Sequence, residues 1–323
     1  MDTKLIPDLS IDRQMFLNLR PCETYPQFRV GHGMAIAHHG ELFQGVVQGA
    51  GGELHRSLVS LPCKVFKSTA TFTATGNSEV IVDPTWKVKS RRAVDIALAY
   101  CGLEKWGGCL RISSNIPVGW GLGSSTSDVT AAIRATVDAF RRSLSQEEIA
   151  SLAVKAELAS DPVMFGKRVV LFAHREGLVL EELGEATPDL EILGFNPYPT
   201  GAGIDTLGFA PARYSWWEIE AFRPMLSLLR RGIQAQHPSL IGRVASASAE
   251  INQKYLPKPH FDRLKVIART TGAAGFQVAH SGTTVGLLFD PNDPKAQRSI
   301  QRAQDLLAEI GVMQTWHFHT NES

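Results

Sequence analysis

A glycine-rich segment, Pro117-Val-Gly-Trp-Gly-Leu-Gly-Ser-Ser-Thr-Ser-Asp128, constrains the fold more than any other part of the sequence. It joins a predicted strand at residues 108–113 to a helix predicted to begin near Ser124. Alternate glycines from 119 to 123 leave the backbone N–H groups open to a close-lying anion. The helix that follows would point its unpaired N–H groups and the positive end of its dipole at the same place. The segment therefore predicts an anion-binding turn between a strand and a helix.

The hydroxyl residues at 124–127 add groups that suit phosphate oxygens or Mg²⁺. The segment is not a Walker loop, because the Gly-Lys-[Ser/Thr] ending is absent. It is not a dinucleotide-binding fingerprint either, because the glycine spacing and the strand context differ. The alternative is an ordinary Gly/Ser turn that caps a helix. The full string Pro-x-x-x-Gly-Leu-Gly-Ser-Ser is more restrictive than such a turn requires.

Strand-like and helix-like patterns alternate in blocks along the rest of the chain. Residues 68–75 are rich in β-branched side chains, and residues 87–100 carry apolar side chains at helical spacing. Ser145 and Glu148 form the capping box of a helix that ends near Leu158. Further strands are predicted at 168–173, 176–182, 190–195, 276–279, 285–289 and 312–318, and further helices at 215–231, 238–254, 260–271 and 293–310. Blocks of this kind predict an α+β fold rather than a strict βαβ repeat.

The length of 323 residues fits one large domain or two ordinary ones. Residues 1–26 are punctuated by prolines and are interpreted as an N-terminal arm. A first domain is predicted at 27–195 and a second at 196–323. The Pro/Gly-rich stretch at 196–211 is interpreted as the junction between them or as a substrate loop.

Charge and composition argue against several classes of partner. The formal net charge is +1, so no strong field recruits nucleic acid or an anionic membrane, and the aromatic residues do not interleave with a Lys/Arg stripe. The four cysteines match no zinc-finger spacing and are expected to be reduced thiols. The N-terminus carries acids where a signal peptide needs a basic flank, and no apolar run reaches about 18 residues. We therefore expect a cytoplasmic protein that binds neither nucleic acid nor membranes.

The glycine-rich segment resembles the second signature of the GHMP kinases, which include galactokinase, homoserine kinase, mevalonate kinase and phosphomevalonate kinase. The segment from His39 to Gly45 occupies the place of the first signature, and residues 272–284 occupy that of the third. The order and separations suit the family over residues 28–318. The resemblance implies a two-lobed fold, with an N-terminal ATP-binding α+β domain and a C-terminal ferredoxin-like α+β domain.

The same resemblance implies that the loop wraps the phosphates of ATP and that one of its serines ligates Mg²⁺. The residues expected to hold ATP are Pro117, Gly119, Gly121, Leu122, Gly123, Ser124, Ser125 and Thr126. By position, Ser125 is the expected metal ligand. Glu157 and Asp161 would share a face if their helix ran on to the loop, and Glu157 could then reach Mg²⁺ beside Ser125. The alternative for Glu157 is a solvated helix residue.

Phosphoryl transfer requires a carboxylate that orients or deprotonates the attacking hydroxyl. GHMP kinases that use a catalytic base carry an aspartate after the helix downstream of the loop, and Asp161 stands at that place in this sequence. The local string Ser160-Asp-Pro-Val-Met-Phe165 lacks the usual Ser-Gly-x-Asp form. The alternative is that Asp161 and Pro162 form an ordinary turn.

The outer segments indicate a branch of the family. His38-His-Gly-Glu-Leu-Phe-Gln-Gly45 and the stretch from Val278 to Phe289 look like the L-threonine kinases of cobalamin assembly and propanediol utilisation. That branch phosphorylates a free hydroxy amino acid. The residues expected to contact such a substrate are Glu41, Gln44, Ser281 and Thr283. Alternatively, Glu41 is a strand-end carboxylate and residues 281–283 form a simple hairpin turn.

Other readings stay open. The acceptor could be another small alcohol, such as homoserine or a sugar-like molecule. The chain could also be a ligand sensor without turnover or a decarboxylase, and a homodimer is possible. Histidines 38 and 39 are expected to serve packing or hydrogen bonding. Asp128 is interpreted as a first-turn acid or a metal contact. The basic residues from 87 to 92 are interpreted as a solvated face, or as a cluster near the nucleotide.

Overall fold

The computed structural model describes residues 29–198 and 212–321. The predicted N-terminal arm and most of the Pro/Gly-rich stretch therefore lie outside the described residues. The strands are β1 (Arg29–Gln48), β2 (Leu54–Thr75), β3 (Val80–Asp83), β4 (Gly107–Ser114), β5 (Val169–Ala173), β6 (Leu178–Gly184), β7 (Glu191–Phe195), β8 (Gly275–Val278), β9 (Val285–Phe289) and β10 (Thr315–His319). The helices are α1 (Val88–Tyr100), α2 (Ser124–Ala139), α3 (Gln146–Glu157), the 3₁₀ helix η2 (Pro162–Phe165), α4 (Trp216–Gln234), α5 (Pro238–Asn252), α6 (Phe261–Thr270) and α7 (Ala296–Glu309).

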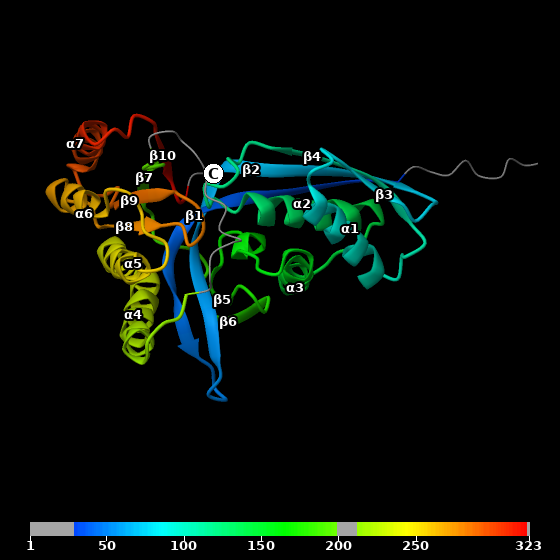
Figure 1. Cartoon of the computed structure of the whole chain (residues 1–323), viewed down its shortest axis with the longest axis horizontal. Helices are drawn as coiled ribbons and strands as arrows, with labels where there is room; N and C mark the ends of the chain where they lie inside the picture. The colour runs from blue at the N-terminus through cyan, green and yellow to red at the C-terminus, as the bar shows by residue number, and fades with distance from the viewer. Residues whose placement is uncertain (1–28, 199–211, 322–323) are drawn as a thin grey trace, which may run out of the picture.

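A long antiparallel hairpin of β1 and β2 connects the two lobes (Figure 1). Along residues 68–75 of β2, buried and less buried side chains alternate, so that Ala70, Phe72 and Ala74 enter the core. The register shifts between Ile36 and Ala37 and again on either side of Glu41. These irregularities lie where the hairpin passes the candidate site.

The first lobe packs three helices, α1, α2 and α3, on one side of the sheet formed by β1, β2, β4 and β3 (Figure 1). Helix α2 lies directly on the backbone of β1. A Cβ atom on Gly33 would stand 2.1 Å from the carbonyl oxygen of Ala131, so only glycine permits this approach. The close packing fixes the start of α2, and with it the glycine-rich loop.

The second lobe has the predicted ferredoxin-like arrangement. Its strands lie in the order β10-β7-β9-β8, and the chain runs β7, α4 to α6, β8, β9, α7, β10. This is a β-α-β-β-α-β unit whose neighbouring strands are antiparallel. The domain boundary expected between residues 195 and 196 stays a prediction. Strand β7, just before it, lies within the sheet of this lobe.

Most predicted elements are confirmed with ends that differ by a few residues. The capping box of α3 is present, with Ser145 Oγ accepting from Glu148 N at 3.1 Å. The last helix begins at Ala296 rather than at 293, and the last strand at Thr315 rather than at 312. Since these shifts are at element ends, the predicted α+β class holds.

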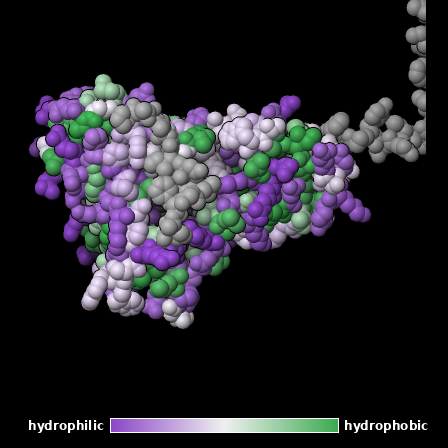
Figure 2. Space-filling view, viewed as in Figure 1, coloured by the Kyte–Doolittle hydropathy of each residue, from purple (hydrophilic) through white to green (hydrophobic). Residues whose placement is uncertain are grey.

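Hydrophilic and hydrophobic residues lie side by side over both lobes on the face shown in Figure 2. Among the described residues, none of the helices is both long enough and apolar enough to span a membrane.

Candidate active site

A cavity of about 910 Å³ is lined by residues of both lobes. Most of the expected site residues line it: Gln44, Gly119, Gly121, Gly123, Ser124, Ser125, Thr126, Glu157, Asp161 and Ser281. Four others do not, namely Pro117, Leu122, Glu41 and Thr283. The structure thus gathers four segments, at residues 44, 119–126, 157–161 and 281, around one hollow, although they are separated in the chain.

The glycine-rich loop adopts the backbone that its glycines predict. Gly119, Gly121 and Gly123 all have positive φ, between 74° and 78°. Gly123 is the N-cap of α2, and none of the described side chains caps the helix there. The first N–H groups of α2 are therefore left for another acceptor, beside the hydroxyls of Ser124 and Ser125.

The segment that follows β8 binds the glycine-rich loop through backbone hydrogen bonds. The carbonyl of Trp120 accepts from the backbone N–H groups of Thr283 and Thr284, at 3.0 and 2.9 Å. A Cβ on Gly121 would stand 1.5 Å from the carbonyl oxygen of Ser281, so the two backbones touch. Thr283 is fully buried, and its role is visible here as a backbone donor to the loop. Its predicted contact with a substrate stays a prediction.

Lys258 supports the same contact from behind. Its ammonium donates to the carbonyl of Gly282 at 2.8 Å. Burial lowers the pKa of Lys258 to about 7. A Cβ on Gly282 would lie 2.2 Å from Gly121 N, so glycine is required on both sides of this contact.

Ser125 and Glu157, which the sequence predicts as metal ligands, lie in contact with each other. Ser125 Oγ donates to Glu157 Oε2 at 2.6 Å, and Lys89 Nζ lies 4.0 Å from the same oxygen. Glu157 is 7% exposed, so the alternative of a solvated helix residue is wrong. Burial raises the pKa of Glu157 to about 7, although the hydrogen bond from Ser125 opposes the shift. Its other oxygen, Oε1, is buried without a hydrogen-bond partner among the described residues. A hydroxyl and an under-satisfied carboxylate are donors that fit Mg²⁺.

The helical spacing expected for Glu157 and Asp161 is wrong. Helix α3 ends at Glu157, and Leu158 turns the chain with φ of 72°. Asp161 instead precedes the 3₁₀ helix η2 and reaches the cavity from the turn. Its carboxylate accepts from Thr126 Oγ1 at 3.3 Å, which ties it to the first turn of α2.

Asp128 and Lys87 form a buried ion pair beneath the loop. Ser68 Oγ also donates to Asp128, at 2.6 Å. The readings of Asp128 as a first-turn acid and of Lys87 as part of a solvated face are therefore wrong. Both residues line the cavity, with Lys89 more exposed beside them. Lys89 is thus an accessible positive charge next to the loop.

Two histidines bridge two carboxylates at the inner wall of the cavity, and we call His38, Glu41, Asp161 and His280 the bridged cluster. His38 Nε2 lies 3.3 Å from Asp161 Oδ2, and His38 Nδ1 lies 3.5 Å from Glu41 Oε1. His280 Nδ1 lies 2.8 Å from Glu41 Oε1, and its Nε2 lies 3.6 Å from Asp161 Oδ1. Ser60 Oγ also donates to Glu41. Glu41 is thus a buried carboxylate behind His280, and not a wall of the cavity.

The bridged cluster has a defined charge state. Burial disfavours the charged form of His38, but Asp161 and Glu41 outweigh it and raise its pKa to about 9. Burial likewise opposes ionisation of Asp161, yet His38 and His280 hold its pKa below the usual range. Burial and the neighbouring His280 lower the pKa of His174 to about 3. At neutral pH, Asp161 is therefore an anion beside a protonated His38 and a neutral His174.

Sequence reasoning missed His174 and His280 as members of the site. His280 stands in the segment that resembles the third signature, but nothing in its spacing shows a contact with Glu41, which is 239 residues earlier. His39 fulfils the expectation of a packing residue. It is fully buried, and its ring contacts Trp316 and Phe318 with centroids 5.4 and 5.2 Å away.

Two arginines line the cavity beside the bridged cluster. Arg56 stands on β2 and Arg175 follows β5, and these strands pair at Ser57 and Ala173. Arg56 Nη2 donates to the carbonyl of Ala212 at 2.5 Å. This wall therefore adds positive charge to the cavity that Asp161 also lines, which suits an anionic group on a bound molecule.

An apolar rim borders the same cavity near the loop. Trp86, Val88 and Val118 are each more than half exposed, at 60%, 59% and 64%. All three line the cavity, and Lys87 Nζ lies 4.4 Å from the centre of the Trp86 ring. Exposed apolar groups around a polar site suit a flat ring that would cover them.

Residues 89–166 match the family described as the GHMP kinases N-terminal domain. This stretch includes the glycine-rich loop, Glu157 and Asp161. By sequence, the chain is 28% identical to an L-threonine kinase of Salmonella typhimurium over 280 residues, which cover 86% of this chain and 87% of that protein. It is 29% identical to an L-threonine kinase of Citrobacter freundii over 193 residues. That match covers 56% of this chain and 62% of the Citrobacter protein, less than two thirds of its length.

By structure, the chain is similar to a homoserine kinase from Cytophaga hutchinsonii. The TM-score is 0.67, and the match covers 94% of this chain and 96% of that one at 16% identity. Identity at that level carries information on the fold alone. The expected two-lobed α+β fold is confirmed by this match.

Proposed function

We propose that this chain, whose residues 89–166 match the GHMP kinases N-terminal domain, is a kinase of that family and transfers the γ-phosphoryl group of ATP to the hydroxyl of a small acceptor. We further propose that the acceptor is a free hydroxy amino acid, with L-threonine the first candidate. One observation carries the proposal. The first turn of α2 stands between two carboxylates in one cavity, with Ser125 bound to Glu157 and Thr126 bound to Asp161.

The loop and the start of α2 are suited to a triphosphate. Their positive-φ glycines expose backbone N–H groups, and the helix dipole favours negative charge there. Lys89 adds an accessible positive charge. The apolar rim of Trp86, Val88 and Val118 would receive the flat base of the nucleotide.

Ser125 and Glu157 would hold the metal ion. A bound Mg²⁺ neutralises charge on the phosphates as the phosphoryl group is transferred. Ser125 supplies a hydroxyl oxygen, and Glu157 supplies a carboxylate whose free oxygen has no partner among the described residues. A cation at this place would favour the ionised form of Glu157 and lower its raised pKa.

Asp161 would orient the acceptor hydroxyl. Its lowered pKa makes it a weak base, so we assign it first to accepting a hydrogen bond from the hydroxyl and aligning the oxygen with the phosphorus. In a loose transition state the hydroxyl proton leaves late, and Asp161 receives it then. His38 and His280 keep Asp161 ionised and fix its position.

The arginine wall supports an amino-acid acceptor. Arg56 and Arg175 line the same cavity as the acid that would face the hydroxyl, and a guanidinium binds a carboxylate with two parallel hydrogen bonds. The sequence likeness to two L-threonine kinases points to the same class of acceptor. The expected substrate contacts of Gln44 and Ser281, which line the cavity directly, are kept as part of the proposal. Those of Glu41 and Thr283, which do not line the cavity, stay predictions.

The test is an acceptor screen that measures ADP release with Mg²⁺ and equal concentrations of L-threonine, L-serine, L-homoserine, mevalonate and galactose. We expect the highest kcat/KM with L-threonine, and O-phosphothreonine identified by ³¹P NMR and product mass. A higher kcat/KM with homoserine or galactose would change the acceptor and leave the kinase reading intact. Binding of ATP without turnover on any acceptor would favour a ligand sensor, and loss of carbon dioxide from a product would reveal a decarboxylase.

A second measurement tests the arginine wall. Arg56→Met should raise KM for L-threonine by about tenfold or more while KM for ATP changes little, because a lost charged hydrogen bond costs about 1.5–3 kcal/mol. An equal rise in both KM values would contradict the assignment to the acceptor. The cytoplasmic location and the homodimer stay predictions.

A further inference from the structure

The last strand carries a pair of histidines that the proposed phosphoryl transfer does not use. His317 and His319 are alternate residues of β10, so their side chains leave the same face of the strand. Phe318 between them points the other way and is 3% exposed. On the neighbouring strand β7, Glu191 stands directly opposite His319 in the register. We call Glu191, His317 and His319 the strand cluster.

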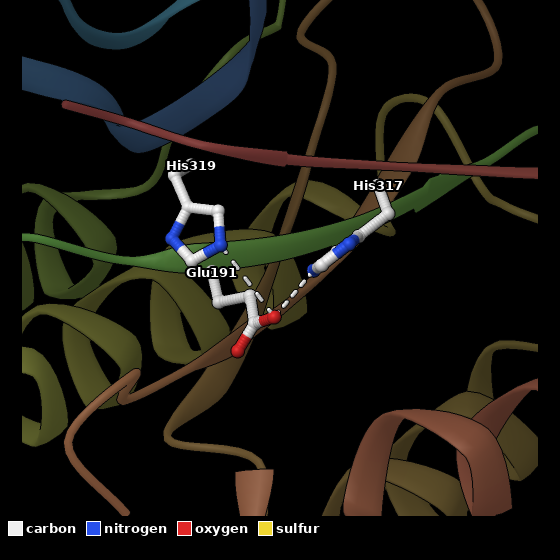
Figure 3. Close-up of side chains that lie close together, drawn as sticks. All are labelled: Glu191, His317 and His319. Carbon is white, nitrogen blue, oxygen red and sulfur yellow. Dashed lines mark ion pairs between the residues drawn. The ribbon is translucent and has the colours of Figure 1, made fainter. Parts of the chain in front are cut away.

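The three side chains converge on one point. Figure 3 shows the carboxylate of Glu191 between the two rings, with both Nε2 atoms directed toward it. Glu191 Oε1 lies 2.7 Å from His317 Nε2 and 3.6 Å from His319 Nε2, and the three ligand atoms lie within 4.8 Å of one another. Ligands about 2.0–2.1 Å from a tetrahedral Zn²⁺ are roughly 3.3 Å apart, so only small movements are needed to hold an ion.

The electrostatics of the strand cluster favour a cation. Glu191 is 1% exposed at the start of a buried strand, where an ionised carboxylate is costly without a partner. Its ion-pair partners in the described part of the chain are these two imidazoles. The side chains of His317 and His319 are 35% and 30% exposed, so an ion can reach the cluster from solvent.

A fourth side chain steadies the carboxylate. Gln297, on α7, donates to Glu191 Oε1 at 2.6 Å. Hydrogen bonds of this kind orient the ligating groups of metal sites. Because none of the three cluster residues lines the large cavity, the strand cluster is separate from the candidate active site.

We propose that Glu191, His317 and His319 bind a divalent transition-metal ion of the Zn²⁺ class, with solvent completing the coordination. Two imidazole nitrogens and one carboxylate oxygen suit Zn²⁺, Co²⁺ or Ni²⁺ better than Mg²⁺ or Ca²⁺, which prefer oxygen. The ion ties β10 to β7. The opposite face of β10 carries Trp316, whose ring stacks on Trp120 of the glycine-rich loop with centroids 5.6 Å apart.

The experiment measures Zn²⁺ binding to the metal-stripped full-length chain by competition with a chromophoric chelator, without ATP or Mg²⁺. His38, Glu41 and Asp161 also bring ligand atoms within 4.8 Å, so every titration is repeated in an Asp161→Asn background. In that background we expect one ion per chain. The double variant His317→Ala/His319→Ala should bind it at least about 100-fold more weakly, and Gln297→Leu about tenfold more weakly.

His55→Ala is the matched control. His55 is also an imidazole between two carboxylates, Glu53 and Glu176, but without a second histidine. The His55→Ala variant should bind Zn²⁺ with the affinity and stoichiometry of the parent. Equal affinity and stoichiometry for the parent and the double variant would overturn the proposal and leave the histidines as hydrogen-bond partners of Glu191.

A direct measurement on the parent covers the case in which the double variant fails to fold. X-ray absorption of the Zn²⁺-loaded Asp161→Asn chain should show two imidazole ligands and at least one oxygen ligand. A spectrum with one imidazole or none would overturn the proposal without any change to β10.

Discussion

The bridged cluster and the strand cluster use the same residue types to different ends. In the bridged cluster, two carboxylates face two imidazoles, and each histidine contacts both acids. In the strand cluster, one carboxylate serves two imidazoles. A protonated imidazole has no lone pair for a metal, and His38 is protonated at neutral pH because its pKa is about 9. The second carboxylate therefore makes the bridged cluster a charge network, whereas the strand cluster fits the metal site that we propose.

The largest expected effect comes from the carboxylate around which the bridged cluster is built. Asp161→Asn keeps the shape of the side chain but removes its charge and its ability to take a proton. We expect kcat for the preferred acceptor to fall by about 10²–10⁴-fold, measured as ADP release, with ATP affinity little changed. Asp305→Asn, at an exposed position on α7, is the control. A kcat near that of the wild type would remove Asp161 from the chemistry.

The next effect tests whether Glu157, outside both clusters, belongs to a magnesium site. Ser125→Ala and Glu157→Gln should each raise the Mg²⁺ concentration for half-maximal rate by about tenfold or more, because each loses one oxygen ligand. Glu147→Gln, near the start of the same helix and half exposed, should leave the Mg²⁺ titration unchanged. An unaltered titration in both test variants would exclude them as ligands.

A third test asks whether His38 controls the charge of Asp161 in the bridged cluster. His38→Gln removes the cation that most lowers the pKa of Asp161, so the acid limb of the kcat/KM profile that reports Asp161 should move to higher pH. The control His55→Gln should keep the wild-type profile. An unshifted acid limb in His38→Gln would show that His38 does not set the charge of Asp161.

The same variant predicts a change in stability with pH. His38 has its pKa raised from 6.5 to about 9, so its contribution to stability is complete below pH 6.5 and is lost as the pH rises through 9. As the pH rises from 6.5 to 9, the free energy of unfolding of the wild type should fall by on the order of 1–3 kcal/mol more than that of His38→Gln, measured by urea unfolding. Parallel pH curves for the two proteins would contradict the assignment.

The smallest effect concerns a residue that acts on the loop from outside both clusters. Lys258→Met removes the donor to Gly282 and should raise KM for ATP by about two- to fivefold, since one hydrogen bond contributes about 1 kcal/mol. Lys254→Met, an exposed lysine on the same segment, is the control. A larger loss in kcat than in affinity would place Lys258 in the chemistry rather than in the support of the loop.

Local signals in the sequence predicted much of the fold. Glycine spacing, the Ser145 capping box and the periodic apolar residues each depend on neighbours along the chain, and the structure contains all of them. The pairing of Ser125 with Glu157 was also anticipated, although through a helix that the structure ends early.

The remainder depends on contacts between distant segments. Glu41 meets His280 because β1 pairs with β8 at Glu41 and Val278, and no local pattern encodes that register. The sequence leaves Lys87 on a solvated face or in a cluster near the nucleotide, because its partner Asp128 lies 41 positions later. His317 and His319 do carry a local signal, an alternation along a strand, but their partner Glu191 is more than 120 residues away.

The β1–β2 hairpin bears on how a ligand enters. Its strands of 20 and 22 residues belong to both lobes, so a continuous hydrogen-bonded strand pair, and not a flexible linker, connects the lobes. Moving the lobes apart would require bending this strand pair. Its register irregularities around Glu41 are where we expect it to bend most easily. We therefore expect the two lobes to move little relative to each other. Ligand entry and release would then depend on the short backbone contact between the glycine-rich loop and residues 281–284.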